Sequence, residues 1–368
     1  MKGNQHMIYI NGSILDETPT GLGVYAKYMI TKLKNLDANI KVFCAVGIDD
    51  IEVVKISRFV KPKYKKLGGL CRFLWTQLVL PFRVNKEDTI YHPFQYLSLF
   101  SRSRQIITIH DFIPVQFPEV AKHQFYYYKY IMPHLLKKAE KVICISENTK
   151  SDIISFYNMD ESKIQVIYNG FDTEQFNDKT NESDNILEKY NIDYKYILMV
   201  GASYKHKNLE TVIKALKTIE QQCNYKILII GKESDYVAEL KKLSLELELS
   251  DRVKFLGYVE GAELPLFYKH AEIFAYPSLY EGFGFPLLEA MACGTAVISS
   301  NSSSLPEVTS DSALLFDPRD EKQLADEIVE LMTNEALKEE LVLKGKQNVQ
   351  RFSWDYTAEK IYKIIKNN

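Results

Sequence analysis

The densest group of residues that could carry chemistry is the string EGFGFPLLE at positions 281–289. It follows an apolar run of strand length, turns through Gly282 and Gly284, and enters a helix with Pro286 in its first turn. Glycines at a turn let the main chain approach a ligand without a Cβ in the way. The backbone N–H groups at a helix start, with the helix dipole behind them, suit a phosphate or diphosphate. This string is therefore predicted to bind an anionic ligand.

Two carboxylates flank the turn, Glu281 before it and Glu289 one turn inside the helix. Carboxylates accept hydrogen bonds from sugar and ribose hydroxyls, and both side chains are expected to point into a cleft at different depths. The alternative for each residue alone is structural, with Glu281 at a helix start and Glu289 facing solvent. The complete string favours the ligand site.

This string resembles the E-x7-E signature of glycosyltransferase family 4, a family of retaining enzymes with the GT-B fold. The resemblance implies that Glu281 contacts the donor sugar and Glu289 the nucleotide ribose, while the intervening backbone holds the sugar hydroxyls and the diphosphate. The donor-binding residues expected here are Glu281, Gly282, Phe283, Gly284, Phe285, Leu287, Leu288 and Glu289.

A second segment, VGASYKHKN at 200–208, resembles the loop in which that family places a basic residue against the diphosphate. That residue would be Lys207, with Ser203 and Lys205 beside the donor. A cation at the positive end of a helix is unfavourable without an anion, which argues against a merely solvated lysine. Many members of the family carry an arginine where this chain has Ala202. Either Lys205 or His206 supplies the missing charge, or the chain belongs to a subgroup whose sequence reads HKN here.

His110 and Asp111 follow the predicted strand QIITIH and resemble the His-Asp pair of the family's N-terminal domain. The resemblance implies that the His110 imidazole faces the transferring sugar, whereas Asp111 is expected to orient the loop or His110. The alternative is a structural histidine at a strand end. The expected catalytic residues are therefore His110, Lys207 and Glu281.

The segment GLGVYA at 21–26 fits the G-x-G-x-x-A pattern of dinucleotide-binding turns. A true dinucleotide turn follows its strand at once, but the apolar run at 8–10 ends about ten residues earlier, which disfavours an NAD-dependent dehydrogenase. In the resembling family a glycine loop here approaches the diphosphate and the acceptor, and Gly21 and Gly23 are assigned that role.

The elements that must position these residues alternate between short apolar runs and amphipathic helices, which predicts α/β domains with parallel sheets. Strands are expected at 7–11, 40–46, 89–92, 105–110, 141–145, 164–168, 196–201, 225–231, 253–259, 272–278, 295–300 and 313–316. Helices are expected at 208–220, 235–248 and 262–270, and from Pro286. Open parallel sheets bind ligands at the carboxyl ends of their strands. Two Rossmann-like domains of the GT-B fold, facing each other across a cleft, are therefore expected.

The polar segment 172–185 is interpreted as a linker. The predicted domains are an acceptor-side domain at 1–180, a sugar-nucleotide domain at 181–350, and a helix at 351–368 that packs back on the first domain. WTQLVLP, ISENTKSDI, VIYNGFD and RFSWDYTAEKIY resemble bacterial mannosyltransferases and rhamnosyltransferases of surface polysaccharides.

The composition, with 46% hydrophobic and 26% charged residues, is that of a globular protein. No signal peptide or membrane span is recognisable, and five scattered cysteines indicate reduced structural thiols, so a cytoplasmic location is expected. Residues 53–86 contain no acid but nine bases: Lys55, Arg58, Lys61, Lys63, Lys65, Lys66, Arg72, Arg83 and Lys86. This stretch is either a peripheral contact with an anionic membrane or a solvated basic face. Nucleic acid is disfavoured because no recognition motif accompanies the charge.

The predicted reaction transfers a sugar, with retention, from a nucleoside-diphosphate sugar to a hydroxyl of a glycan or lipid-linked oligosaccharide in polysaccharide biosynthesis. GDP-mannose is the first donor expected, dTDP-rhamnose the second, and a UDP-sugar stays open. Contacts around Tyr258 and Val259 are expected to select the base. No metal-ligand spacing stands in these motifs, so transfer without a metal or cofactor is predicted. The alternatives are a sugar-nucleotide epimerase or phosphorylase of the same fold and a non-catalytic sugar-nucleotide sensor.

Overall fold

The structure is a computed structural model that describes residues 6–18, 21–48, 50–179 and 185–367. It divides into two compact units. Unit 1 comprises Met1–Gly170 and Phe352–Asn368, and unit 2 comprises Phe171–Arg351. The chain therefore leaves unit 1 once and returns to it for its last helix.

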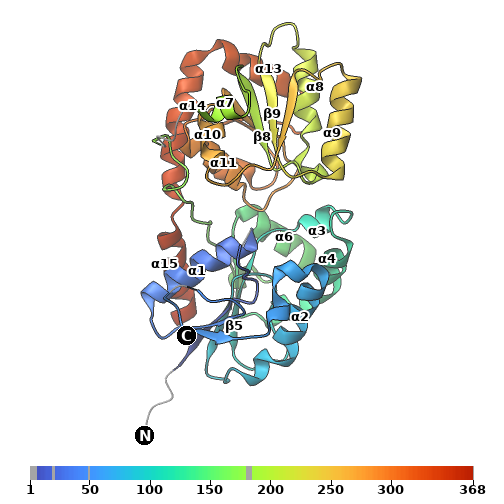
Figure 1. The fold of residues 1–368 in the computed structure, drawn as a ribbon. Helices are drawn as coiled ribbons and strands as arrows, with labels where there is room; N and C mark the ends of the chain where they lie inside the picture. The colour runs from blue at the N-terminus through green and yellow to red at the C-terminus, as the bar shows by residue number, and fades with distance from the viewer. Residues whose placement is uncertain (1–5, 19–20, 49, 180–184, 368) are drawn as a thin grey trace. The chain divides into compact units, whose positions relative to one another are not determined.

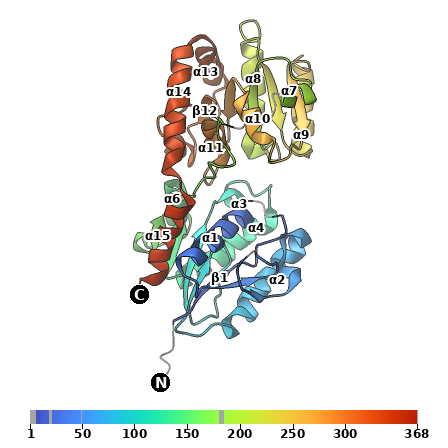
Figure 2. The same ribbon diagram turned by 60° about the vertical axis from the view of Figure 1, so that its left-hand side comes forward.

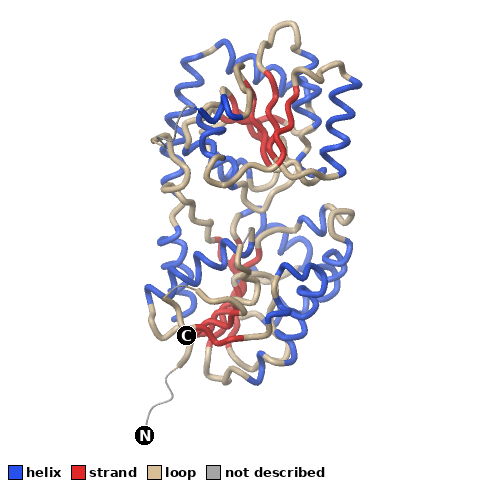
Figure 3. The backbone as a smooth tube through the Cα atoms, in the orientation of Figure 1, coloured by secondary structure: helices blue, strands red, loops and turns tan. Residues whose placement is uncertain are grey.

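Unit 1 is built on a seven-stranded sheet in the order β3-β2-β1-β4-β5-β6-β7, in which all neighbours are parallel (Figure 3). Its strands are β1 (Ile8–Asn11), β2 (Lys41–Cys44), β3 (Val53–Lys55), β4 (Thr89–His92), β5 (Arg104–Ile109), β6 (Lys141–Cys144) and β7 (Ile164–Val166). The strand order reverses direction at β1, where the neighbours are β2 and β4. Sheets of this kind bind ligands near that point, at the carboxyl ends of the strands.

Helices cover both faces of this sheet. Helices α1 (Leu22–Leu36) and α15 (Trp354–Lys366) lie together on one face, and α2 (Lys65–Leu78) lies on the other (Figures 1 and 2). Trp354 connects α15 to α1, because its ring stacks on that of Tyr28 of α1 at a centroid distance of 4.6 Å. The remaining α-helices of unit 1 in the described residues are α3 (Ile113–Gln116), α4 (Lys122–Tyr126), α5 (Met132–Lys138) and α6 (Glu147–Tyr157), with a π-helical turn (Tyr127–Ile131) between α4 and α5. Short 3-10 helices span Arg58–Val60, Pro62–Tyr64, Leu80–Phe82 and Glu161–Lys163.

Unit 2 has a six-stranded parallel sheet in the order β10-β9-β8-β11-β12-β13. Its strands are β8 (Tyr196–Val200), β9 (Lys226–Ile230), β10 (Val253–Gly257), β11 (Ile273–Tyr276), β12 (Val297–Ser300) and β13 (Leu314–Phe316). Its helices are α7 (Asn185–Lys189), α8 (Glu210–Thr218), α9 (Asp235–Glu246), α10 (Leu264–Lys269), α11 (Phe285–Ala292), α12 (Leu305–Thr309), α13 (Glu321–Thr333) and α14 (Glu335–Asn348). Again the order reverses at the first strand, β8, which places the loops after β8 and β11 side by side.

The expected strands all have a counterpart in the structure, and among the described residues β3 is the one strand that was not predicted. It is a three-residue edge strand whose residues are partly exposed, so it lacks the continuous apolar run that marked the others. The two parallel, Rossmann-like sheets that were predicted are confirmed.

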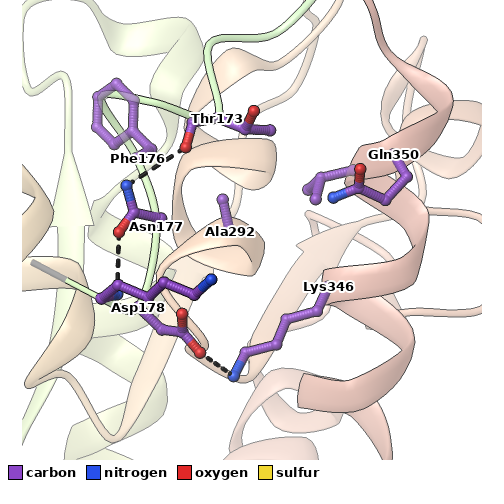
Figure 4. Close-up of a pocket in the computed structure, with 9 residues that line it drawn as sticks. Thr173, Phe176, Asn177, Asp178, Ala292, Lys346 and Gln350 are labelled. Atoms are coloured by element: carbon purple, nitrogen blue, oxygen red, sulfur yellow. Dashed lines mark hydrogen bonds and ion pairs between the residues drawn. The ribbon is translucent and has the colours of Figure 1, made fainter.

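The segment expected to be a linker is packed into unit 2 over its described part. Phe171 and Phe176 are buried, and the Phe176 ring meets the edge of Tyr268. Asp178 forms an ion pair with Lys346 at 2.7 Å. Phe176, Asp178 and Lys346 line an open cavity of about 510 Å³ between the segment, the end of α11 and α14 (Figure 4). Residues 180–184, the rest of the expected linker, lie outside the described residues.

Candidate functional site

Three polar side chains meet in unit 2 where β8 and β11 end. The Lys207 ammonium lies 2.7 Å from Glu281 Oε1 and donates to the Tyr276 hydroxyl at 3.1 Å. The same hydroxyl donates to Glu281 Oε1 at 2.8 Å, which closes a triangle. Lys207 and Glu281 are 74 positions apart in sequence, so the sheet brings together the two segments that were singled out independently.

Local backbone structure fixes the position of Lys207. The loop after β8 turns at Gly201, whose φ is 85°, and forms a 3-10 turn over Lys205–Lys207. Asn208 ends that turn in the left-handed conformation, and its side-chain amide donates to the carbonyls of Pro277 and Pro318. Asn208 thereby ties the lysine loop to the end of β11. Asn208 belongs to the HKN pattern, but no role was predicted for it from the sequence.

Two serines from a different loop hold the Glu281 turn. The Glu281 N–H donates to Ser303 Oγ at 2.9 Å, and Ser304 Oγ donates to the carbonyls of Glu281 and Phe283. Sequence reasoning missed both serines. Their signal is the polar run NSSS at 301–304, which directly follows β12 and so lies at the same carboxyl edge of the sheet.

Gly284 lies in the turn before α11, in a backbone conformation that favours glycine. Its φ is 106°, a conformation that side chains rarely adopt, and an added Cβ would lie 2.7 Å from Leu305 Cδ2. Glycine is therefore needed here for both backbone conformation and space. The residue stands at the N-terminal cap of α11.

The first turn of α11 offers fewer amides to a ligand than the sequence analysis assumed. Pro286 has no N–H, and the Leu287 N–H donates to the Gly284 carbonyl at 3.1 Å. The side chains of Leu287 and Leu288 are fully buried, and those of Phe283 and Phe285 pack edge to face. Of the amides at 285–288, those of positions 286 and 287 are therefore not available to an anion.

Mutual attraction stabilises the charges of Lys207 and Glu281. Burial alone would lower the pKa of the Lys207 ammonium, but the Glu281 carboxylate and the Tyr276 hydroxyl raise it above its usual value. Burial likewise pushes the pKa of Glu281 upward, yet Lys207 and then His206 hold it below its usual range. Both groups are thus ionised at neutral pH.

Glu289 has the opposite electrostatic character. Its carboxylate accepts a hydrogen bond from the Tyr268 hydroxyl at 2.8 Å. Burial raises the pKa of Glu289 to about 7, although that hydrogen bond and the charge of Lys207 pull it down. The two glutamates of the string therefore differ in charge near neutrality, which suits them to different ligand groups.

The other donor-binding residues expected in unit 2 are not all directed to this cluster. Lys205 forms an ion pair with Glu239 of α9 at 2.8 Å. His206 is buried, and it is one of the groups that lower the pKa of Glu281.

Ser203 follows Ala202 in the loop after β8, and its N–H donates to the Gly201 carbonyl at 2.7 Å. Tyr258 is 66% exposed after β10, with the Lys232 ammonium 5.1 Å from its ring centre, while Val259 is buried. Of the two residues expected to select the base, Tyr258 therefore has an exposed side chain and Val259 does not.

His110 occupies the end of β5 in unit 1. Its Nε2 lies 2.9 Å from the Pro93 carbonyl and its ring meets the Tyr25 ring edge to face at 4.6 Å. Burial lowers the pKa of His110 to about 4, so the imidazole is neutral at pH 7. Because Nε2 must carry the proton that Pro93 accepts, Nδ1 is the acceptor. Asp111 accepts from the Ile113 N–H at 3.0 Å, which is the loop-orienting role expected of it.

The two glycines of the 21–26 segment differ in their surroundings. Gly21 caps α1 with a φ of 50° and is exposed, and nothing lies within 4 Å of where its Cβ would be. Gly23 is buried inside the helix. Gly21 is therefore the one whose backbone a ligand can approach.

Within the described residues, no group of three or more His, Cys, Asp or Glu side chains is placed to hold a metal ion. The five cysteines are free thiols, four of them buried. Across the same part of the chain, every helix is too short or too polar to cross a bilayer.

Comparisons with known proteins agree with this arrangement. Residues 19–175 match the family model "Glycosyltransferase Family 4", and residues 182–348 match "Glycosyl transferases group 1". An O-antigen chain mannosyltransferase, RfbU of Salmonella typhimurium, is 32% identical over 85% of this chain and 87% of its own length. The O-antigen chain mannosyltransferase B of Escherichia coli is 27% identical over 91% of this chain and 93% of its own length.

Solved structures share the fold. Anabaena HepE (Alr3699), crystallised with UDP and glucose, superposes with a TM-score of 0.74 at 18% identity, covering 98% of this chain and 99% of that one. WaaG, a glycosyltransferase of lipopolysaccharide biosynthesis, gives a TM-score of 0.71 at 14% identity, covering 98% of this chain and all of that one. The chain therefore belongs to the glycosyltransferases that combine a family 4 domain with a group 1 domain, and its two parallel-sheet units are the domains of the GT-B fold.

Proposed function

We propose that this glycosyltransferase moves mannose from GDP-mannose, with retention of configuration, to a hydroxyl of a glycan or lipid-linked oligosaccharide in surface polysaccharide biosynthesis. The observation that carries the proposal is the buried Lys207–Glu281 pair beside the glycine turn that opens α11. Mannose is preferred to rhamnose because both relatives described above are O-antigen mannosyltransferases.

In this proposal Lys207 and the Gly282–Gly284 turn bind the donor diphosphate. An ammonium has three N–H donors, and Glu281 and Tyr276 accept two of them, which leaves the third for a phosphate oxygen. The Glu281 carboxylate is fixed by the same contacts and accepts hydrogen bonds from the sugar hydroxyls. Tyr276 is thus a positioning residue for both.

Glu289 accepts hydrogen bonds from the ribose hydroxyls, and Tyr268 orients it. The exposed ring of Tyr258 packs against the base. His110 is neutral and contributes as a hydrogen-bonding group on the acceptor side, with Nδ1 as an acceptor. Gly21 lets the backbone approach the diphosphate and the acceptor.

The bond between the anomeric carbon and the diphosphate oxygen breaks, and a bond from the same carbon to the acceptor oxygen forms on the same face. The acceptor hydroxyl gives its proton to the departing diphosphate. The charge that develops on the diphosphate is stabilised by Lys207, already fixed in position before the reaction begins. We propose that no metal ion or cofactor takes part.

The decisive experiment offers GDP-mannose, dTDP-rhamnose and a UDP-sugar separately to the purified chain with an alkyl mannoside acceptor. The expected product is an α-linked mannoside from GDP-mannose alone, assigned by NMR, and formed equally with EDTA. A β-linked product would overturn retention, and loss of activity in EDTA that Mg²⁺ restores would overturn metal independence. Conversion of the nucleotide sugar without acceptor-linked product would favour the epimerase.

A further inference from the structure

Helix α2 of unit 1 carries a stripe of leucines on its outer surface. Leu67, Leu70, Leu74 and Leu78 are 56%, 54%, 43% and 58% exposed. Their spacing of three and four residues places them within about 80° of arc on a helix that turns about 100° per residue. Phe82, 87% exposed just after the helix, extends the stripe.

This exposed apolar surface is concentrated in one place. Among the described residues, seven of the eighteen large hydrophobic side chains that are exposed lie between 59 and 82. Single exposed leucines are ordinary on a protein surface, but a contiguous apolar patch marks an interaction site.

Helix α2 is packed firmly against the sheet on its other side, so loose packing does not explain the exposed leucines. On the other side of α2, Trp75 packs in an apolar cluster with Tyr9 and Phe43 of the sheet. The Arg72 guanidinium donates to the Val60 carbonyl at 2.6 Å, and the Gln77 amide donates to the Leu97 carbonyl at 2.7 Å. The helix is therefore fixed through its inner side while it presents leucines outward.

Exposed bases precede and follow the stripe in the sequence. Residues 53–86 contain no acid, and the exposed bases are Lys55, Arg58, Lys63, Lys65, Lys66, Arg83 and Lys86. Two of the nine bases in this stretch do not contribute, because Lys61 and Arg72 are buried. Glu17 forms an ion pair with Lys61 at 2.6 Å and with the exposed Lys63 at 3.4 Å, so the charge of Lys63 is partly neutralised. The prediction that all nine bases form one surface is therefore wrong for Lys61 and Arg72.

We propose that the outer face of α2, with Phe82, docks unit 1 on a bilayer that contains anionic lipid. Leucines and a phenylalanine suit the boundary between headgroups and acyl chains, and the flanking bases suit anionic headgroups. The charge selects this partner: a second copy of the chain would bring the same acid-free, basic stretch against itself.

Polar contacts connect the residues just before α2 to the loop after β1, which lies at the carboxyl edge of the sheet. The Lys63 N–H donates to Asp16 Oδ2 at 2.9 Å, and Lys61 reaches Glu17 in the loop after β1. Asp16, Glu17 and Lys61 line an open cavity of about 510 Å³ in unit 1. Docking would hold this cavity beside the membrane. If the proposed function holds, a lipid-linked acceptor would then reach the carboxyl edge without leaving the bilayer.

Vesicle flotation tests the docking by itself, with no nucleotide sugar present. The full chain should float with phosphatidylcholine vesicles containing phosphatidylglycerol and much less with phosphatidylcholine alone. The variant Leu67→Ser/Leu70→Ser/Leu74→Ser should bind at least about tenfold more weakly. The variant Lys65→Gln/Lys66→Gln/Arg83→Gln should lose roughly a hundredfold, since three charges are removed.

Control variants in unit 2 change two exposed leucines, against three in the test variant, and three exposed lysines. Leu245→Ser/Leu343→Ser alters leucines that are 69% and 60% exposed, and Lys214→Gln/Lys241→Gln/Lys242→Gln removes three charges. Both controls should float like the parent chain. All variants should keep the parent's melting temperature, because the leucines and lysines chosen are at least partly exposed.

Three results would overturn the proposal. Wild-type flotation that does not depend on anionic lipid would remove the role of the bases, and unchanged flotation of the leucine variant would remove the stripe. A change from dimer to monomer in the leucine variant, measured by light scattering, with unchanged flotation would show that the face binds a second copy. Failure of the proposed function would appear separately, as absent transfer to a water-soluble acceptor.

Discussion

The ammonium of Lys207 lies 2.7 Å from the Glu281 carboxylate, and the two side chains are only 17% and 10% exposed. An ion pair buried to this degree costs desolvation energy on both sides, and removing one partner leaves the other charge buried without compensation. Stability and catalysis are therefore coupled at this pair. A single substitution would report on both at once.

Lys207→Met and Glu281→Gln should each lower the free energy of unfolding by about 3–5 kcal/mol, whereas the double variant should lie close to the parent. All three should lose transfer by at least about a hundredfold, because each removes at least one of the two proposed ligand contacts. Urea unfolding and the transfer assay measure the two effects. If the single variants unfold like the parent, the pair is not buried in solution.

Glu289→Gln should change how stability depends on pH. The pKa of this carboxyl is about 7 in the folded protein against 4.5 in the reference state, so the folded protein binds more protons between these values. Parent stability therefore falls as pH rises from 4.5 to 7, and the loss is complete above 7. Glutamine cannot ionise, so the variant should gain up to about 3 kcal/mol on the parent between pH 4.5 and 8. If the difference in unfolding free energy between variant and parent is the same at pH 5 and pH 8, this prediction is wrong.

Donor affinity should rise with pH through the same group. If ribose hydroxyls donate to the Glu289 carboxylate, GDP binding requires the ionised form and should strengthen between pH 6 and 8. In the Glu289→Gln variant this dependence should disappear. Calorimetric titration with GDP at several pH values makes the measurement, and a parent affinity independent of pH would refute the ribose contact.

His110→Phe keeps the ring shape but removes the hydrogen bond to the Pro93 carbonyl, which is then buried without a donor. We expect a loss of about 1–3 kcal/mol in unfolding free energy. Because burial lowers the pKa of His110 to about 4, transfer by the parent should show no titration of this residue between pH 6 and 8. A histidine signal titrating near pH 6.5 by NMR would contradict a neutral, buried ring.

Gly284→Ala should distort the donor turn. The φ of 106° and the 2.7 Å approach of the new Cβ to Leu305 both oppose a side chain, and the expected cost is about 1–3 kcal/mol with weaker GDP binding. Gly47→Ala is the control, because nothing lies within 4 Å of where its Cβ would be. Equal effects of the two substitutions would show that the turn is not strained.

Sequence patterns predicted most of the fold because buried parallel strands are continuous apolar runs, such as YILMV of β8 and KILII of β9. The pairing of Lys207 with Glu281 could be anticipated, because both segments follow strands and strand ends share one edge. Tyr276, Ser303 and Ser304 could not, since their roles depend on hydrogen bonds between loops that no local pattern records. The charge difference between Glu281 and Glu289 likewise depends on tertiary neighbours.

Because the chain returns to unit 1 after Arg351, unit 2 is a continuous insertion and unit 1 is made of two separate stretches. An expressed fragment covering 171–351 would contain every residue of its unit. A fragment ending at Gly170 would lack Trp354, whose backbone and ring lie against Gly170 and whose ring stacks on Tyr28. Shortening the protein from its C-terminus therefore damages the half that is synthesised first, which cannot be completed until the ribosome reaches the last helix.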